Sequence, residues 1–214
     1  MWPRILPFST YIGFIVISSL IPEESPLAIW LYPVKTFAVV GLLMYFWSNY
    51  QELPRPVFVS FQEGMGAIGV GILVYVLWVR MDWDWAIQGE MTGYNPFQEG
   101  EGVGPLLAAV RIFGAVAVVP IMEELFWRSF LIRWIINQDF EKVTLGTFTI
   151  GSFAATVILF GLEHHQWLAG MLAGGAYNAL LYKTGRLWPC VVAHATTNLV
   201  LGIHVLTTGE WQWW

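Results

Sequence analysis

The sequence predicts an all-α protein, a polytopic transmembrane helical bundle. Three observations support this fold class. Hydrophobic residues make up 57% of the chain, and a soluble fold of 214 residues could not bury so much apolar surface in one core. Charged residues make up only 12%, about half the usual share. Trp, Phe and Tyr are abundant, with 13, 14 and 8 copies, as is typical where rings sit at membrane interfaces.

About seven apolar segments follow one another, each close to the roughly 20 residues that cross a bilayer. They run approximately over 5–21, 27–48, 57–80, 104–136, 144–163, 167–183 and 187–208. The first has no small-residue cleavage site after it, so we expect a first span rather than a removable signal peptide.

The breaks between segments are polar or rich in proline. Residues 21–26 and 51–56 combine proline with charge, which ends helices and suits a wet interface. The longest break, 81–102, is acidic, and we expect an exposed loop there with Trp83 and Trp85 at the interface.

The fourth segment is too long for a straight span. Its 33 residues would extend about 50 Å as a helix, and Pro120 in its middle removes a backbone hydrogen bond. We therefore expect a kinked or broken fourth helix at Pro120. The last three segments follow it as ordinary spans.

One membrane domain, 1–214, is the simplest organisation, because no internal repeat is present. Within it, 1–103 would hold the N-terminal spans and the acidic loop, and 104–208 the core with the chemistry. No basic patch suggests nucleic acid, and the single cysteine, Cys190, excludes an internal disulfide. A cytoplasmic N-terminus agrees with the positive-inside tendency, because it places most basic residues at cytoplasmic helix ends: Arg4, Arg55, Arg133, Lys142, Lys183 and Arg186.

The first polar group within an apolar segment is Glu123, Glu124 and Arg128. Charges inside a span are costly and indicate function. Glu124 and Arg128 are four residues apart and share a helix face, so they can pair. Glu123 points about 100° away from Glu124, which leaves one carboxylate free. The alternative is a structural ion pair that tolerates burial.

Two further groups carry histidine. Glu163, His164 and His165 end the fifth segment, where a histidine more often has a structural or interfacial role than a catalytic one. His194 and Asn198 lie one turn apart on a face of the last segment. Side chains of this kind also hold membrane helices together. For the intramembrane Arg111 and His204 we expect structural roles.

Together these groups are sufficient for peptide-bond hydrolysis by activated water. A buried carboxylate beside a histidine can hold and deprotonate water, and donors such as His and Asn can stabilise an oxyanion. No serine or cysteine nucleophile motif is apparent, and the zincin pattern is absent.

The three motifs occur in the order that is typical of one known family. Glu-Glu-x-x-x-Arg (Glu123 to Arg128), Phe-x-x-x-His (Phe160 to His164) and His-x-x-x-Asn (His194 to Asn198) resemble the CPBP family of CAAX proteases and bacteriocin-processing enzymes, which includes Rce1-like endopeptidases. Residues 174–189 also resemble the family's approach to its last motif. The resemblance covers roughly 104–200.

The resemblance implies a glutamic intramembrane endopeptidase. Glu123 would be the general base, His164 would help to hold the water, and His194 and Asn198 would form the oxyanion hole. Glu124 and Arg128 would support them. The resemblance favours a site without a cofactor, but a divalent metal such as zinc, held by Glu123, His164 and His194, stays open because two histidines and a carboxylate are an acceptable zinc set.

The sequence departs from this pattern in two respects. Glu163 stands before His164, where the family often has a small residue. Span counting also places His164 near the outer end of its helix and His194 near the cytoplasmic end of its own. A working site requires similar depth, so either a segment is re-entrant or the fifth helix starts deeper in the membrane.

We therefore predict a multi-pass membrane protease that cuts a membrane-embedded or lipidated protein substrate reached through the lipid bilayer. A rival interpretation is a non-catalytic scaffold, immunity or secretion-accessory protein of the same fold, whose polar residues only hold helices together. A third is a small transporter with Glu123 and His194 as a proton relay. The lack of an evident inverted repeat argues against it.

Overall fold

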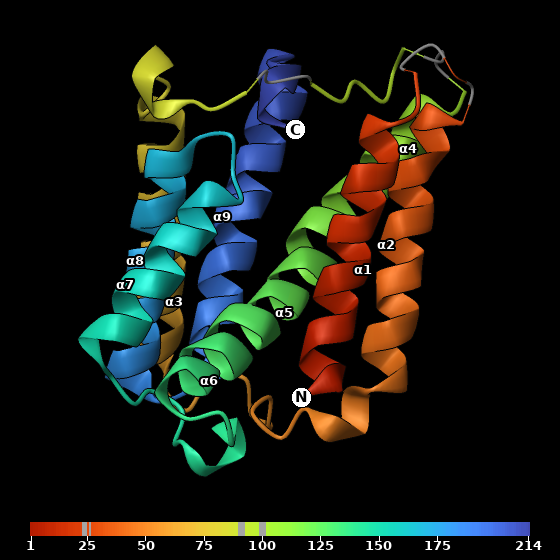
Figure 1. Cartoon of the computed structure of the whole chain (residues 1–214). Coiled ribbons are helices and arrows are strands. Elements are labelled where there is room, and N and C mark those ends of the chain that lie inside the picture. Colours follow the sequence, from red (N-terminus) through yellow and green to blue (C-terminus); the bar gives the residue numbers. More distant parts are fainter. Residues whose placement is uncertain (23–24, 26, 90–92, 99–101) are drawn as a thin grey trace.

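The computed structural model describes residues 1–22, 25, 27–89, 93–98 and 102–214, and within them the chain is helical without strands (Figure 1). Parts of the predicted first turn and of the predicted acidic loop lie outside the described residues. The helices are α1 (Trp2–Ser19), α2 (Ala28–Tyr45), α3 (Phe61–Arg80), α4 (Gly104–Phe113), α5 (Val119–Glu124), α6 (Ile132–Ile136), α7 (Ile150–Leu162), α8 (Trp167–Thr184) and α9 (Leu187–Thr208). The all-α prediction is confirmed.

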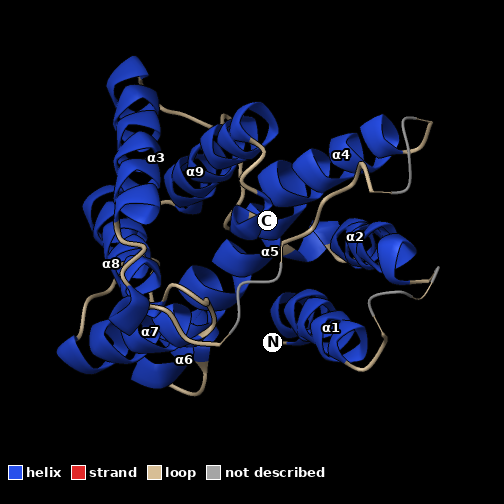
Figure 2. Ribbon diagram, turned by 90° about the horizontal axis from the view of Figure 1, so that it is seen from above, coloured by secondary structure: helices blue, strands red, loops and turns tan. Residues whose placement is uncertain are grey.

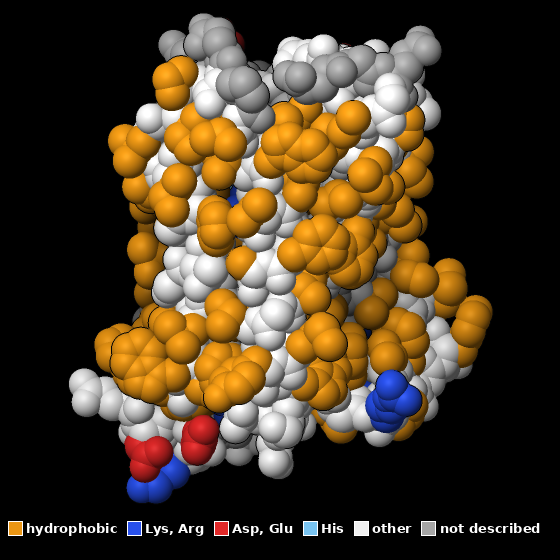
Figure 3. All heavy atoms as spheres, turned by 90° about the vertical axis from the view of Figure 1, so that its right-hand side faces the viewer, with side chains coloured by type: hydrophobic (Ala, Val, Ile, Leu, Met, Phe, Trp, Pro, Cys, Tyr) orange, Lys and Arg blue, Asp and Glu red, His pale blue; other side chains and the backbone are white. Residues whose placement is uncertain are grey.

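Four described helices are long and apolar enough to cross a membrane: Ala28–Tyr45, Phe61–Arg80, Gly104–Ile136 and Leu187–Thr208. α7 is a shorter apolar helix of 13 residues. On the face formed by α1 and α2, hydrophobic side chains cover the height of the bundle and charges gather at one end (Figure 3). The protein is thus an integral membrane protein, while seven spans stay a prediction.

Local capping explains where α3 and α7 begin later than predicted. Ser60 caps α3 by accepting a hydrogen bond from the Glu63 amide, after a proline-rich loop. Thr149 caps α7 in the same way, accepting from the Ser152 amide. Side-chain oxygens at this position satisfy free amides of the first turn. The fifth helix therefore starts at Ile150 rather than near 144. A later start of this helix was one of the two ways in which we expected His164 and His194 to reach a similar depth; the other was a re-entrant segment.

The long fourth helix is not broken at Pro120. Gly104–Ile136 is one continuous helix in which π turns at Gly114–Val118 and Leu125–Leu131 stand on either side of α5. Such π turns accommodate residues that disturb the regular hydrogen-bond ladder. Figure 1 shows this helix running obliquely from the upper right to the lower left, which is how its length fits in the bundle.

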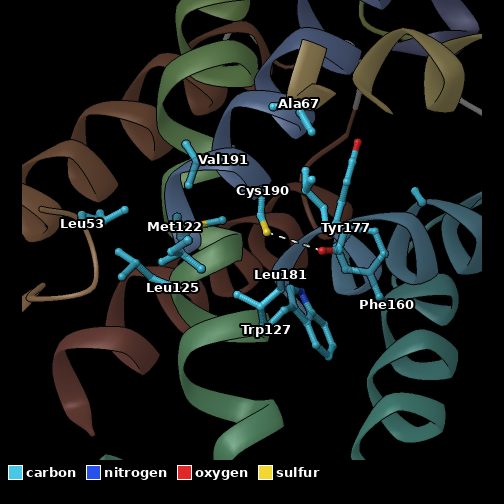
Figure 4. Close-up of a cluster of buried hydrophobic side chains, with 14 of the residues drawn as sticks. Leu53, Ala67, Met122, Leu125, Trp127, Phe160, Tyr177, Leu181, Cys190 and Val191 are labelled. Carbon is cyan, nitrogen blue, oxygen red and sulfur yellow. Dashed lines mark hydrogen bonds between the residues drawn. The ribbon is translucent and has the colours of Figure 1, made fainter. Parts of the chain in front are cut away.

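The oblique helix divides the bundle. Seen from above, α1 and α2 lie on one side of it, and α3, α8 and α9 lie on the other (Figure 2). α3 packs extensively on α9, and α7 on α8. Where these groups meet, a buried apolar cluster includes Met122, Leu125, Tyr177 and Cys190, with the Cys190 thiol near the Tyr177 carbonyl at 3.4 Å (Figure 4).

Candidate active site

A cavity of about 390 Å³ lies between the two halves of the bundle. Its walls come from α1, α2, α3, the long helix, α7, α8, α9, the turn between α7 and α8, and the C-terminal residues. Glu123, His164, His194 and Asn198, the four residues predicted to be catalytic, all line it, and so does Glu163. Ionisable groups from distant parts of the chain therefore share one cavity.

Glu123 is a buried carboxylate with an unsatisfied oxygen. The residue is 5% exposed, and its Oε2 has no hydrogen-bond partner among the residues that the structure describes. Burying an acceptor without a donor costs free energy, and the cost is larger for a charged group. Such a group can be satisfied by a molecule that enters the cavity, which is what a general base requires.

Glu124, its neighbour in the chain, also has one buried oxygen without a partner in the described residues, Oε2, but its other oxygen is bonded. Its Oε1 accepts from Arg128 Nη1 at 3.2 Å and from His194 Nδ1 at 3.0 Å. The predicted Glu124–Arg128 pair is confirmed, with both side chains almost fully buried. This pair lies behind the cavity wall rather than in it.

Arg128 connects three helices. Its Nε donates to Asn178 Oδ1 at 3.1 Å and its Nη2 to the Gly174 carbonyl at 3.3 Å, both on α8. Asn178 in turn donates to Thr156 Oγ1 of α7 at 3.0 Å. Because the guanidinium has fixed donor directions, this network orients the helices around the cavity.

His164 has a defined tautomer. Its Nδ1 lies 2.7 Å from the Phe160 carbonyl, and a carbonyl only accepts, so Nδ1 carries the hydrogen. In the neutral ring Nε2 is then an acceptor. The ring is held between Trp78, edge-on at 5.2 Å, and Phe160 at 4.8 Å.

His194 and Asn198 share a face of α9, as their spacing predicted. The His194 ring stacks on Tyr177, with centroids 5.2 Å apart, and its Nδ1 bond to Glu124 leaves Nε2 as the free nitrogen. Asn198 Nδ2 donates to the Ala115 carbonyl at 2.8 Å, beside the first π turn. One amide hydrogen and the amide oxygen of Asn198 stay free of this bond.

The loop before the long helix fixes the histidine turn, which sequence reasoning did not anticipate. Gln88 Nε2 donates to the carbonyls of Leu162 at 2.8 Å and His164 at 2.9 Å, and the Gln88 carbonyl is 2.9 Å from His165 Nδ1. Glu163 Oε2 accepts from Trp127 Nε1 at 3.1 Å. Contacts between loops leave no periodic signal in a sequence, so these could not have been found.

Two further basic residues line the cavity: Lys35 and Arg111. Arg111 was predicted to be structural, and Lys35 was not singled out, although each was signalled as the single charge of an apolar helix, α4 and α2 respectively. His204 lies away from the cavity, between Tyr75 Oη at 3.1 Å and Glu210 Oε2 at 2.8 Å, in keeping with a structural role.

A divalent metal at this site stays an untested alternative. Throughout the described ranges, no three His, Cys, Asp or Glu side chains are grouped so that they could hold a metal ion. Glu123, His164 and His194 share a cavity but do not form such a group.

Comparison with known proteins points to the same region of the chain. A family model described as type II CAAX prenyl endopeptidase, Rce1-like, matches residues 105–200. This range contains all three motifs and the long helix from its second residue. No curated protein and no solved structure matches the chain significantly.

Proposed function

We propose that the chain is an intramembrane endopeptidase in which Glu123 activates water, a proposal supported by the match of its residues 105–200 to the Rce1-like family model. The observation that carries the proposal is the buried, unsatisfied Glu123 carboxylate in a cavity that it shares with two histidines. The family supports CAAX-type protease activity in general. The roles of individual residues are our proposal.

The reaction begins when Glu123 takes a proton from a water molecule in the cavity. The hydroxide oxygen attacks the carbonyl carbon of the scissile bond and forms a tetrahedral oxyanion. Glu123 then gives the proton to the leaving nitrogen as the carbon–nitrogen bond breaks. The products are a new carboxyl end and a new amine end, and the glutamate returns to its initial state.

His164 positions the water. With its hydrogen on Nδ1 engaged by Phe160, its Nε2 can accept one hydrogen of the water while Glu123 accepts the other. The aromatic contacts with Trp78 and Phe160 hold the ring in place, so little reorganisation is needed in the transition state.

His194 and Asn198 stabilise the oxyanion. Asn198 has one amide hydrogen free of its bond to Ala115. His194 donates to the oxyanion from Nε2 when both ring nitrogens carry hydrogen, with its Nδ1 bonded to the Glu124 carboxylate. Arg128 and Glu124 neutralise each other behind the cavity wall.

The proposed substrate is a membrane-associated protein, and the name of the matching family suggests a lipidated one. Aromatic and aliphatic side chains from the first helix, Tyr11 and Ile15, form part of the cavity wall. Such a wall suits an apolar peptide that arrives through the bilayer.

The test compares cleavage by wild type and by Glu123→Gln, both reconstituted in liposomes with a fluorescence-quenched, S-farnesylated peptide. Glutamine keeps the shape but cannot act as a base, so we expect a loss of at least a hundredfold in kcat, in line with general base catalysis. His164→Ala should also abolish cleavage while leaving membrane insertion intact. Equal cleavage by Glu123→Gln and wild type would overturn the mechanism. Arg80→Gln, at the exposed end of α3, is the matched control.

A further inference from the structure

Lys35 of α2 and Arg111 of α4 form a basic pair in the cavity wall. Lys35 is only 8% exposed, and its ammonium lies 4.0 Å from the Tyr11 ring centre and 4.9 Å from that of Tyr32. The Arg111 guanidinium lies 4.3 Å from the Tyr32 ring centre. The two cations thus share the Tyr32 ring.

Neither cation has an anionic partner in the described part of the chain. Both lie over aromatic rings, and Arg111 Nε is buried without an acceptor. The buried arginines Arg4 and Arg128 are paired by contrast, Arg4 with Glu52 at 2.6 Å and Arg128 with Glu124 at 3.2 Å. Because a charge in a membrane span is expensive unless it is paired, this pair is suited to an anion that enters the cavity.

The pair is aligned with the proposed general base. Arg111, Ala115, Val119 and Glu123 all line the cavity and follow one another at intervals of four residues along the long helix. In a regular α-helix, each of these four residues would lie about 40° further round the helix axis than the one before it. The π turn at Gly114–Val118 holds more residues per turn and opposes this drift. Arg111 and Glu123 therefore face the same cavity, about 18 Å apart along the axis.

We propose that Lys35 and Arg111 bind the free C-terminal carboxylate of the peptide that the enzyme cuts. This inference rests on the proposed function, because it presumes a peptide in the cavity. A planar carboxylate matches the guanidinium fork, with the ammonium as a second donor. An extended peptide spans about 3.3 to 3.6 Å per residue, so the cut would fall no more than about five residues from the substrate's C-terminus.

A lipid phosphate is the other source of a buried anion, and the depth of the pair argues against it. Lys35 and Arg111 are each the eighth residue of their helix, which is about 10 Å from the helix start. Headgroup phosphates lie outside the hydrocarbon region. A peptide end can reach this depth because its apolar side chains can enter the cavity with it.

The experiment measures binding without cleavage, in the Glu123→Gln protein in detergent micelles. Two fluorescent peptides carry S-farnesyl cysteine fourth from the end and differ only in a C-terminal carboxylate or amide. We expect the amide to bind at least tenfold more weakly. Lys35→Met and Arg111→Met should weaken binding of the carboxylate peptide about tenfold and that of the amide less than twofold. Arg80→Met should change neither.

Equal affinity for the two peptides in the Glu123→Gln protein would overturn the proposal, and this comparison needs no further variant to fold. Equal losses for both peptides in folded Lys35→Met would also overturn it. A further arm replaces phosphatidylcholine in the micelles by the anionic phosphatidylglycerol. If phosphatidylglycerol competes with the carboxylate peptide for binding, and this competition disappears in Arg111→Met, the pair binds an anionic lipid headgroup instead. A wild type that fails to cleave while still preferring the carboxylate peptide would count against the hydrolysis and leave the carboxylate site standing.

Discussion

At the scale of single residues, two adjacent glutamates differ in their partners and in their place. Each has one buried oxygen without a hydrogen-bond partner in the described residues, but Glu124 is paired through its other oxygen with Arg128 and His194, whereas Glu123 has no such pair and lines the cavity. The sequence could predict the separation of the two side chains and the Glu124–Arg128 pair, because both follow from the period of one helix. It could not predict the bonds from Glu124 to His194 or from Arg128 to Asn178, because those partners lie on other helices.

This contrast predicts opposite effects on stability. Glu124→Gln leaves a buried Arg128 without its counter-charge, which costs about 3–5 kcal/mol in buried pairs. Glu123→Gln removes a carboxylate that has no partner on one oxygen, so we expect an unchanged or raised melting temperature. Thermal unfolding of purified protein in detergent, followed by tryptophan fluorescence, measures both. A large, equal loss in the two variants would instead favour the scaffold interpretation, in which both glutamates hold helices together.

At the scale of helices, the apolar runs predicted the order of the elements but not their starts or their irregular turns. The starts of α3 and α7 depend on the caps Ser60 and Thr149, which span counting ignores. Pro120 correctly marked an irregular helix. The π turns that replace a break depend on packing between the halves of the bundle, which no local pattern records.

The α3–α9 contact offers a matched pair of glycines. A Cβ at Gly71 would overlap the Ala193 carbonyl and lie 2.6 Å from Thr196 Cβ, and the Gly71 carbonyl already accepts from Thr197 at 2.9 Å. Gly71→Ala should therefore destabilise by about 1–3 kcal/mol, the usual range for overpacking. It should also lower kcat, because the strain falls next to His194.

Gly69→Ala, two residues earlier, is the control, since nothing lies within 4 Å of its added Cβ. Alanine is also the better helix former by up to about 1 kcal/mol. Unfolding in detergent should separate the two variants clearly. Similar stability for both would mean that α3 and α9 do not approach as closely as described.

At the scale of the whole molecule, a polar network joins the N-terminal helix to the long helix. Arg4 donates to both oxygens of Glu52, at 2.6 and 2.9 Å, and Ser129 also donates to Glu52. Burial alone would raise the pKa of Glu52, but the hydrogen bonds from Arg4 and Ser129 outweigh it and hold the pKa below its ordinary value of 4.5.

The lowered pKa predicts how stability depends on acid. A carboxyl whose pKa is lower in the folded protein stabilises it above the unfolded pKa, and this contribution is lost as pH falls through the folded pKa. The melting temperature should therefore drop on acidification below about pH 4.5, and by less in Glu52→Gln. Glu141→Gln is the control, because Glu141 is exposed and its carboxylate approaches Arg4 no closer than 4.0 Å. An unchanged acid response in Glu52→Gln would contradict the assignment.

The distribution of basic residues over the bundle predicts its orientation in the membrane. Arg4 and Arg133 line a second cavity at one end of the bundle, beside Glu141. Arg80 stands at the far end of α3. The positive-inside tendency then places the N-terminus and the turn near Lys142 in the cytoplasm.

Single-cysteine labelling tests this orientation, and Cys190 is already silent because it is buried. The exposed positions Lys142 and Trp83 lie at opposite ends, so each receives a cysteine in turn. A membrane-impermeant maleimide added to sealed, right-side-out vesicles should label Trp83→Cys at once and Lys142→Cys only after permeabilisation. The reverse result would put the N-terminus outside. It would leave the site chemistry intact, because inverting the bundle moves no side chain relative to another, but the end of the cavity nearest Trp83 would then face the cytoplasm.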